Sequence, residues 1–169
     1  MLLVGGTAQS TVLITVEEAL EQAFPGSTTD RQTLFLSDEQ REAVERESGA
    51  EVTSALATRY EARDEKGTVI GWAYLDTHRV RTLPETLMIV LDGDGTVKRV
   101  EVVTFREPLE YMPREGWYGQ YEGQQLDQDL ALKRDIRPVT GATLTARATT
   151  AAVRRILAIH EVASEEGEQ

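Results

Sequence analysis

Hydrophobic residues change their spacing after the first third of this chain. Up to residue 50 they fall in short clusters between charged stretches, whereas from residue 51 they alternate with polar residues. This period-two alternation, rich in Val, Ile, Thr and Tyr, predicts four strands, at residues 51–60, 69–80, 85–91 and 96–105. The segments 64–67 and 92–95 between them have the Asp and Gly composition of tight turns. Strands joined by such turns predict an antiparallel sheet.

Two short helices are predicted before these strands. Thr15 and Glu18 have the spacing of a capping box, and Pro25-Gly26 ends the helix that they begin. Ser37 and Gln40 form a second capping box, which introduces a charged helix ending near Gly49. Residues 31–36, between the two helices, are predicted to form a strand.

After residue 105 the strand pattern stops. Residues 107–135 contain aromatic residues and prolines among Gly and Gln, which predicts a long structured excursion with one helical turn. A last helix is predicted at 143–162, because small and aliphatic side chains recur there at helical spacing, namely Leu144, Ala148, Ala151, Ala152, Ile156, Ile159 and Ala163. The acidic residues 164–169 are expected to be a disordered tail. Together these elements predict one α+β domain, an antiparallel twisted sheet with flanking helices and a C-terminal helix.

Composition narrows the possible chemistry. The chain has 169 residues, enough for one domain with a hydrophobic core, and its net charge of −11 disfavours binding to nucleic acid. It has no cysteine, only two histidines far apart and no G-x-S-x-G turn, so thiol, metal and serine-hydrolase chemistry are unsupported. Reactive chemistry here is therefore expected to come from a bound cofactor.

The first ten residues have the composition of the end of a secretory signal. A few apolar residues are followed by Ala8 and Ser10, which fit the −3 and −1 positions of a cleavage site. Export from the cytoplasm is the favoured interpretation, and the alternative is a flexible leader on a cytoplasmic protein.

The segment 139–146 has the features of an anion site at the start of the last helix. Backbone amides in a first helical turn lack intrahelical partners and carry a partial positive charge. Gly141 and Ala142 allow a ligand close to the backbone, while Thr140, Thr143 and Thr145 offer hydroxyls. The alternative is structural, with Thr140 as the N-cap and the other threonines filling space.

Thr140-Gly-Ala-Thr143, followed by Leu144-Thr145, resembles the motif of the FMN-binding domain family. This family includes the flavin subunits of the Na⁺-pumping quinone reductase and of the Rnf electron-transport complex. The resemblance implies an FMN cofactor whose phosphate a flavin transferase joins to Thr143, with the neighbouring motif residues around it.

The resemblance extends to the excursion before the motif. Glu107-Pro108 and the Trp117 segment occur in the family's order, and Tyr111 lies about where the family covers the flavin ring. We therefore expect Leu109, Tyr111 and Trp117 to cover the ring system. In place of the family's Asp, six residues before the acceptor threonine, stands Arg137, which could instead pair with the phosphate of a non-covalently held FMN.

What the resemblance implies is an electron-transfer module, not a stand-alone enzyme, and no catalytic residue is assigned. It implies a redox partner at the membrane and an extracytoplasmic location. Two alternatives stay open, a flavin-free adaptor of the same fold in a cell-envelope complex and a phosphate-ester enzyme with Glu107 as base. Along the chain we expect a leader at 1–10, N-terminal helices and strands at 11–65, the FMN-binding domain at 66–163 and the tail at 164–169.

Three further residues have open or modest roles. Arg79 and Arg81 could meet the flavin or a carboxylate such as Glu85 or Glu107, or belong to a surface network of ion pairs. His78 is predicted to be a hydrogen-bonded structural histidine.

Overall fold

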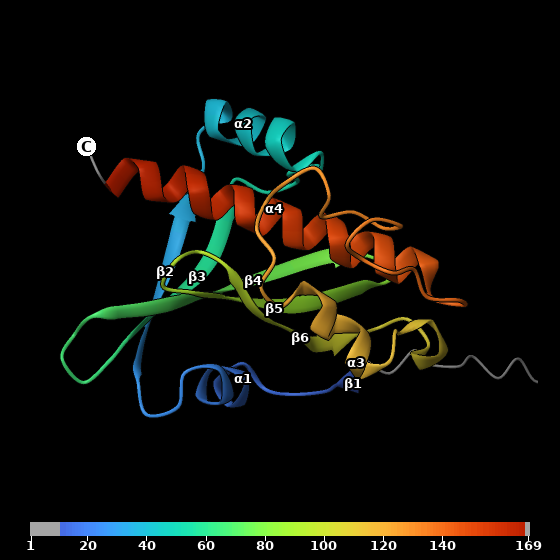
Figure 1. Cartoon of the computed structure of the whole chain (residues 1–169), viewed down its shortest axis with the longest axis horizontal. Coiled ribbons are helices and arrows are strands. Elements are labelled where there is room, and N and C mark those ends of the chain that lie inside the picture. Colours follow the sequence, from blue (N-terminus) through green and yellow to red (C-terminus); the bar gives the residue numbers. More distant parts are fainter. Residues whose placement is uncertain (1–10, 168–169) are drawn as a thin grey trace, which may run out of the picture.

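One sheet with helices on both faces forms the protein. The computed structural model describes residues 11–167, and its six strands lie in the order β1-β6-β5-β4-β3-β2, each pair of neighbours antiparallel. Helix α4 crosses one face with α2 beside it, and α1 packs on the opposite face (Figure 1). The predicted α+β fold is confirmed.

The strands that form the sheet follow the predicted pattern closely. Their bounds are β1 Thr11–Val12, β2 Thr28–Phe35, β3 Leu56–Arg63, β4 Val69–Arg79, β5 Pro84–Asp92 and β6 Val97–Phe105. The prediction is wrong at residues 51–55, which belong to no strand. There the amide of Val52 donates to the Glu45 carboxylate, so this segment is tied to α2 and not to the sheet.

Both early helices begin as predicted. α1 (Val16–Ala23) and α2 (Asp38–Ser48) start with complete capping boxes at Thr15 and Ser37. In each, the cap side chain accepts from a backbone amide of the first turn, and the side chain three residues later accepts from the cap's own amide. Gly49 ends α2 with a φ of 66°, a left-handed conformation that glycine adopts without steric cost.

The excursion after β6 contains three short helical segments, η1 (Leu109–Tyr111), α3 (Glu115–Tyr118) and η2 (Gly119–Tyr121). The last helix, α4, spans Thr143–Gly167. The expected disorder is therefore wrong for residues 164–167, where the helix continues. Residues 168–169 and the expected leader at 1–10 lie outside the described residues.

Buried ionic side chains fix α4 on the sheet. Arg155 donates to both carboxylate oxygens of Asp76 at 2.9 and 2.7 Å, and His78 lies 2.8 Å from both Asp76 and Glu85. Burial lowers the pKa of His78, but hydrogen bonds and attraction from the two carboxylates outweigh it and raise the pKa to about 9. The prediction of a structural histidine agrees with this geometry.

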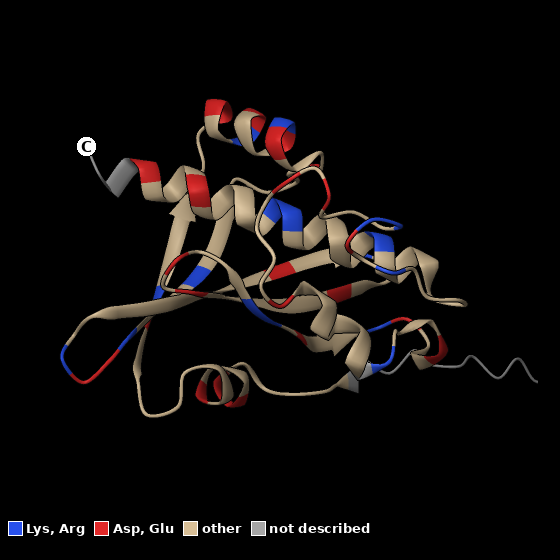
Figure 2. Cartoon of the chain, in the orientation of Figure 1, with Lys and Arg blue, Asp and Glu red and all other residues tan. Residues whose placement is uncertain are grey.

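Acidic side chains gather at the far end of α4 from Thr143. They lie on α2 and on the last turns of α4, which carry Glu161 and Glu165 (Figure 2). The start of α4 is therefore removed from the main concentration of negative charge, which favours an anion there.

Candidate functional site

The start of α4 leaves its backbone amides open. Thr143 is the first helical residue, and Ala142, which precedes it, has no side-chain oxygen to cap the helix. The first backbone bond of the helix runs from the Ala146 amide to the Ala142 carbonyl at 2.9 Å. The Thr143 side chain is exposed, and its hydroxyl makes one long bond of 3.4 Å to the Val139 carbonyl. This is the geometry of an anion site with an accessible hydroxyl.

The residues before Thr143 give a ligand access to the backbone. Gly141 has a φ of +84°, and nothing lies within 4 Å of where a Cβ would stand. Thr140 is exposed, but α4 begins three residues later, so Thr140 is not the N-cap considered as an alternative. The space and the exposed hydroxyls fit the phosphate end of FMN.

Two hydrogen bonds hold the loop that leads to this site. The Arg137 amide donates to the Gln120 side chain at 2.8 Å, and the Trp117 indole N–H donates to the Arg137 carbonyl at 2.7 Å. The Trp117 ring meets Tyr118 and Tyr121 edge-on. Trp117 therefore positions the loop through its nitrogen, while the Arg137 side chain is exposed at the same end of the molecule.

Thr145 differs from Thr143 although it lies in the same helical turn. Its side chain is fully buried, and its hydroxyl donates to the Tyr111 carbonyl at 2.5 Å. The sequence predicted that this hydroxyl would be available to a phosphate. That prediction is wrong, because the hydroxyl is already bonded to Tyr111. Instead it joins η1 to α4, which brings Tyr111 to the start of the helix.

Two exposed leucines flank the same end of the protein. Leu109 in η1 is 53% exposed and Leu144 in α4 is 47% exposed. Exposed apolar side chains beside a polar anion site suit a ligand with an anionic end and an apolar ring, such as FMN.

Glu107 is an anchor for the turn between β4 and β5. One of its carboxylate oxygens accepts from the amides of Arg81, Thr82 and Leu83, at 3.2, 2.7 and 2.8 Å. Desolvation raises the pKa of Glu107, but these hydrogen bonds prevail and hold its pKa below the usual value. A carboxylate that accepts three backbone hydrogen bonds and has a lowered pKa is a poor general base. This argues against the phosphate-ester enzyme considered from the sequence. Pro108, directly after it, is exposed and leads into η1.

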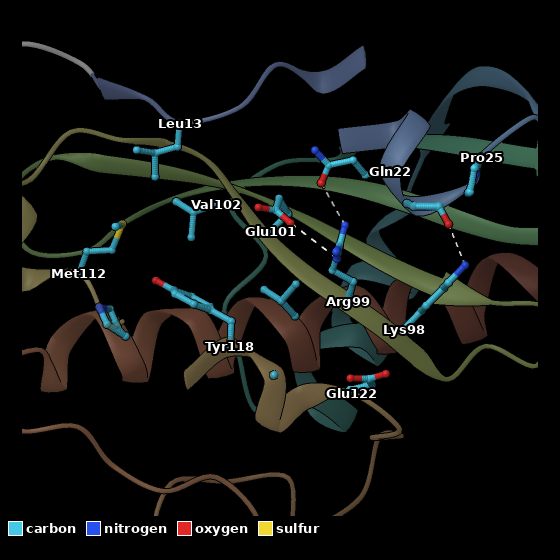
Figure 3. Close-up of a pocket in the computed structure, with 14 residues that line it drawn as sticks. Leu13, Gln22, Pro25, Lys98, Arg99, Glu101, Val102, Met112, Tyr118 and Glu122 are labelled. Atoms are coloured by element: carbon cyan, nitrogen blue, oxygen red, sulfur yellow. Dashed lines mark hydrogen bonds and ion pairs between the residues drawn. The ribbon is translucent and has the colours of Figure 1, made fainter. Parts of the chain in front are cut away.

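A cavity of about 710 Å³ lies beside β6, between α1 and the excursion (Figure 3). None of the predicted site residues lines it; its walls include Leu13, Lys98, Val102, Met112 and Tyr118. No local sequence pattern marks this cavity, because its walls come from segments far apart in the chain. Its place next to η1 and α3 shows that the excursion has two faces, one toward α4 and one toward this cavity.

Comparison with known proteins identifies one family. Residues 83–158 match the FMN-binding domain, a span that holds β5, β6, the excursion and the first part of α4. The matched span includes every predicted site residue, from Glu107 to Thr145. No curated protein matches the chain. Residues 83–158 belong to the FMN-binding domain family, and FMN is the cofactor of this protein.

Proposed function

We propose that this protein is an electron-transfer module that carries FMN at the start of α4. The observation that supports this most strongly is the open helix end, with Thr143 exposed at its first position and Gly141 and Thr140 beside it. Bound FMN supplies the transfer of one or two electrons, while the protein orients it and tunes its potential. Within residues 11–167, no cluster of three or more acidic, His or Cys side chains could hold a metal ion as a competing redox centre.

We also propose that the flavin is attached covalently, through its phosphate, to Thr143. A new bond would join the Thr143 oxygen to the flavin phosphorus. The phosphoanhydride bond of a flavin dinucleotide would break, and the nucleoside monophosphate on the far side of that bond would leave. The hydroxyl proton would pass to solvent. A flavin transferase is the expected catalyst. The support for Thr143 over its neighbours is exposure, since the Thr145 hydroxyl is buried and bonded to Tyr111.

The redox partner and location are proposed on separate grounds. The small and apolar residues at the start of the chain favour export, and a membrane-bound redox partner follows from the kind of complex in which related domains act. No helix among the described residues is long and apolar enough to cross a bilayer. Attachment to Thr143 would keep FMN bound where free flavin is scarce.

Intact mass under denaturing conditions tests the attachment. Protein produced in a host with the flavin transferase should be yellow and heavier by one FMN less one water. Thr143→Ala should lose this mass increment completely and stay folded, because the Thr143 side chain makes only one long hydrogen bond. Thr53→Ala, which changes an exposed threonine outside the motif, is the matched control and should keep the increment.

Two outcomes would redirect the proposal. A yellow protein that releases its FMN on denaturation would favour non-covalent binding, for which we propose that the exposed Arg137 side chain pairs with the phosphate. A colourless protein that also fails to bind added FMN would overturn the electron-transfer function and favour an adaptor role.

A further inference from the structure

We propose that Arg81 is the positively charged residue that faces the bound flavin ring and stabilises its reduced form. This inference rests on the proposed function, because it requires FMN at the start of α4. It assigns to one residue of the β4–β5 turn the tuning of the flavin's potential.

The backbone of Arg81 is fixed by the Glu107 anchor. Its amide is one of three that donate to the Glu107 carboxylate, and the Val80 amide closes the same turn by donating to the Leu83 carbonyl at 3.0 Å. The turn joins two long strands of the sheet, so its position relative to the core is set on both sides. The backbone from which the Arg81 side chain extends is therefore held rigidly.

The side chain of Arg81 lies over the ring of Tyr111, a residue expected to cover the flavin. Its guanidinium carbon lies 4.7 Å from the centroid of the Tyr111 ring, the distance of a cation–π contact. The Tyr111 carbonyl in turn accepts the Thr145 hydroxyl in the first turn of α4. One chain of contacts thus runs from Arg81 through Tyr111 to the helix end where the flavin phosphate is proposed to bind.

The charge of Arg81 is not neutralised by a neighbouring acid. Among the side chains that the structure describes, no carboxylate forms an ion pair with its guanidinium, whereas Arg155 is paired with Asp76. The Arg79 guanidinium, two residues away, donates to the Thr82 carbonyl and is thereby held against its own turn. Arg81 is thus a cation that is held in place but keeps N–H donors for a ligand.

A fixed cation beside a flavin changes the energy of its reduction. A flavin ring gains negative charge on reduction, and that charge gathers on the ring edge that bears carbonyl oxygens. A guanidinium near this edge lowers the free energy of the reduced form more than that of the oxidised form, because Coulomb attraction acts only on the added charge. We expect the preference for the reduced form to be about tenfold greater with Arg81 than without it.

The reduction potential of the flavin-loaded protein tests this inference. Arg81→Gln should lower the midpoint potential by about 30 mV, the equivalent of a tenfold change for a two-electron couple. Arg81→Lys keeps the charge and should restore most of the potential. Arg79→Gln, in the same turn, is the matched control and should leave the potential unchanged, as a merely structural role of Arg81 would also do.

Binding of FMN and riboflavin by protein produced without the transferase separates two sources of the effect. If Arg81 faces the ring, Arg81→Gln should weaken the binding of reduced FMN and of reduced riboflavin by the same factor, because both ligands share the ring that carries the added charge. A loss confined to FMN would overturn the inference and place Arg81 at the phosphate. An unchanged potential in a yellow Arg81→Gln protein would also overturn it, while failure of the unmodified protein to bind flavin would instead refute the proposed function.

Discussion

The middle of α4 carries polar side chains that are hydrogen-bonded to other elements, whereas its first turn carries an exposed one. In the middle, Arg154 donates to the carbonyls of Ser48, Asp127 and Leu130, and Arg155 is held in two bonds by Asp76. In the first turn, the hydroxyl of Thr143 is exposed and the preceding residue offers no cap. The middle thus secures the helix to the rest of the fold, so that its first turn can stay open for a ligand without loss of the helix position.

The largest predicted loss of stability comes from removing His78 from its ionic cluster with Asp76 and Glu85. His78→Leu would leave the Glu85 carboxylate fully buried without its cationic partner, with only a long bond from Thr149. Removing one partner of a buried ion pair costs about 3–5 kcal/mol, so we expect a loss of that order in the free energy of unfolding, measured by urea denaturation. A loss below about 1 kcal/mol would show that the cluster does not secure α4.

Alkaline pH should weaken the same region without mutation. His78 has its pKa raised from 6.5 to about 9, so its stabilising contribution is full below pH 6.5 and is lost as the pH rises toward 9. The free energy of unfolding should therefore decline through this window. In His78→Gln, which does not titrate, the decline attributable to this residue should disappear, and an identical slope in both proteins would contradict the assignment.

The smallest effects sharpen the contrast between capped and open helix ends. Ser37→Ala removes the cap hydroxyl of α2 and should lower the free energy of unfolding by about 1 kcal/mol. Thr143→Ala at the open end of α4 should change stability by less than about 0.5 kcal/mol, because the side chain is exposed and its one bond is long. Parallel urea titrations of the two variants without flavin provide the comparison. Equal losses would mean that Thr143 supports the helix and is not reserved for a ligand.

Local sequence signals were sufficient for most of the fold. The capping boxes at Thr15 and Ser37, the left-handed Gly49 and the turns at 64–67 and 92–95 are each decided by neighbours within a few residues. The same holds for the proposed phosphate end of the site, because the motif at 140–143 and the helix after it are adjacent in the chain. The segment 51–55 was mispredicted because its strand-like composition competes with a hydrogen bond to α2, which sequence spacing does not reveal.

By itself, the sequence determined where the two early helices begin, that a run of antiparallel strands follows and which family the domain resembles, since each depends on residues close together in the chain. Only the tertiary structure decided which of two threonines in one helical turn is available. Thr143 faces solvent, whereas Thr145 is covered by Tyr111, which lies 34 positions away. It also decided that Glu107 holds the turn bearing Arg81, although 26 positions separate them. Exposure and pairing depend on which surfaces the folded chain brings together, and hydrogen bonds over such separations form only when the sheet and α4 have packed.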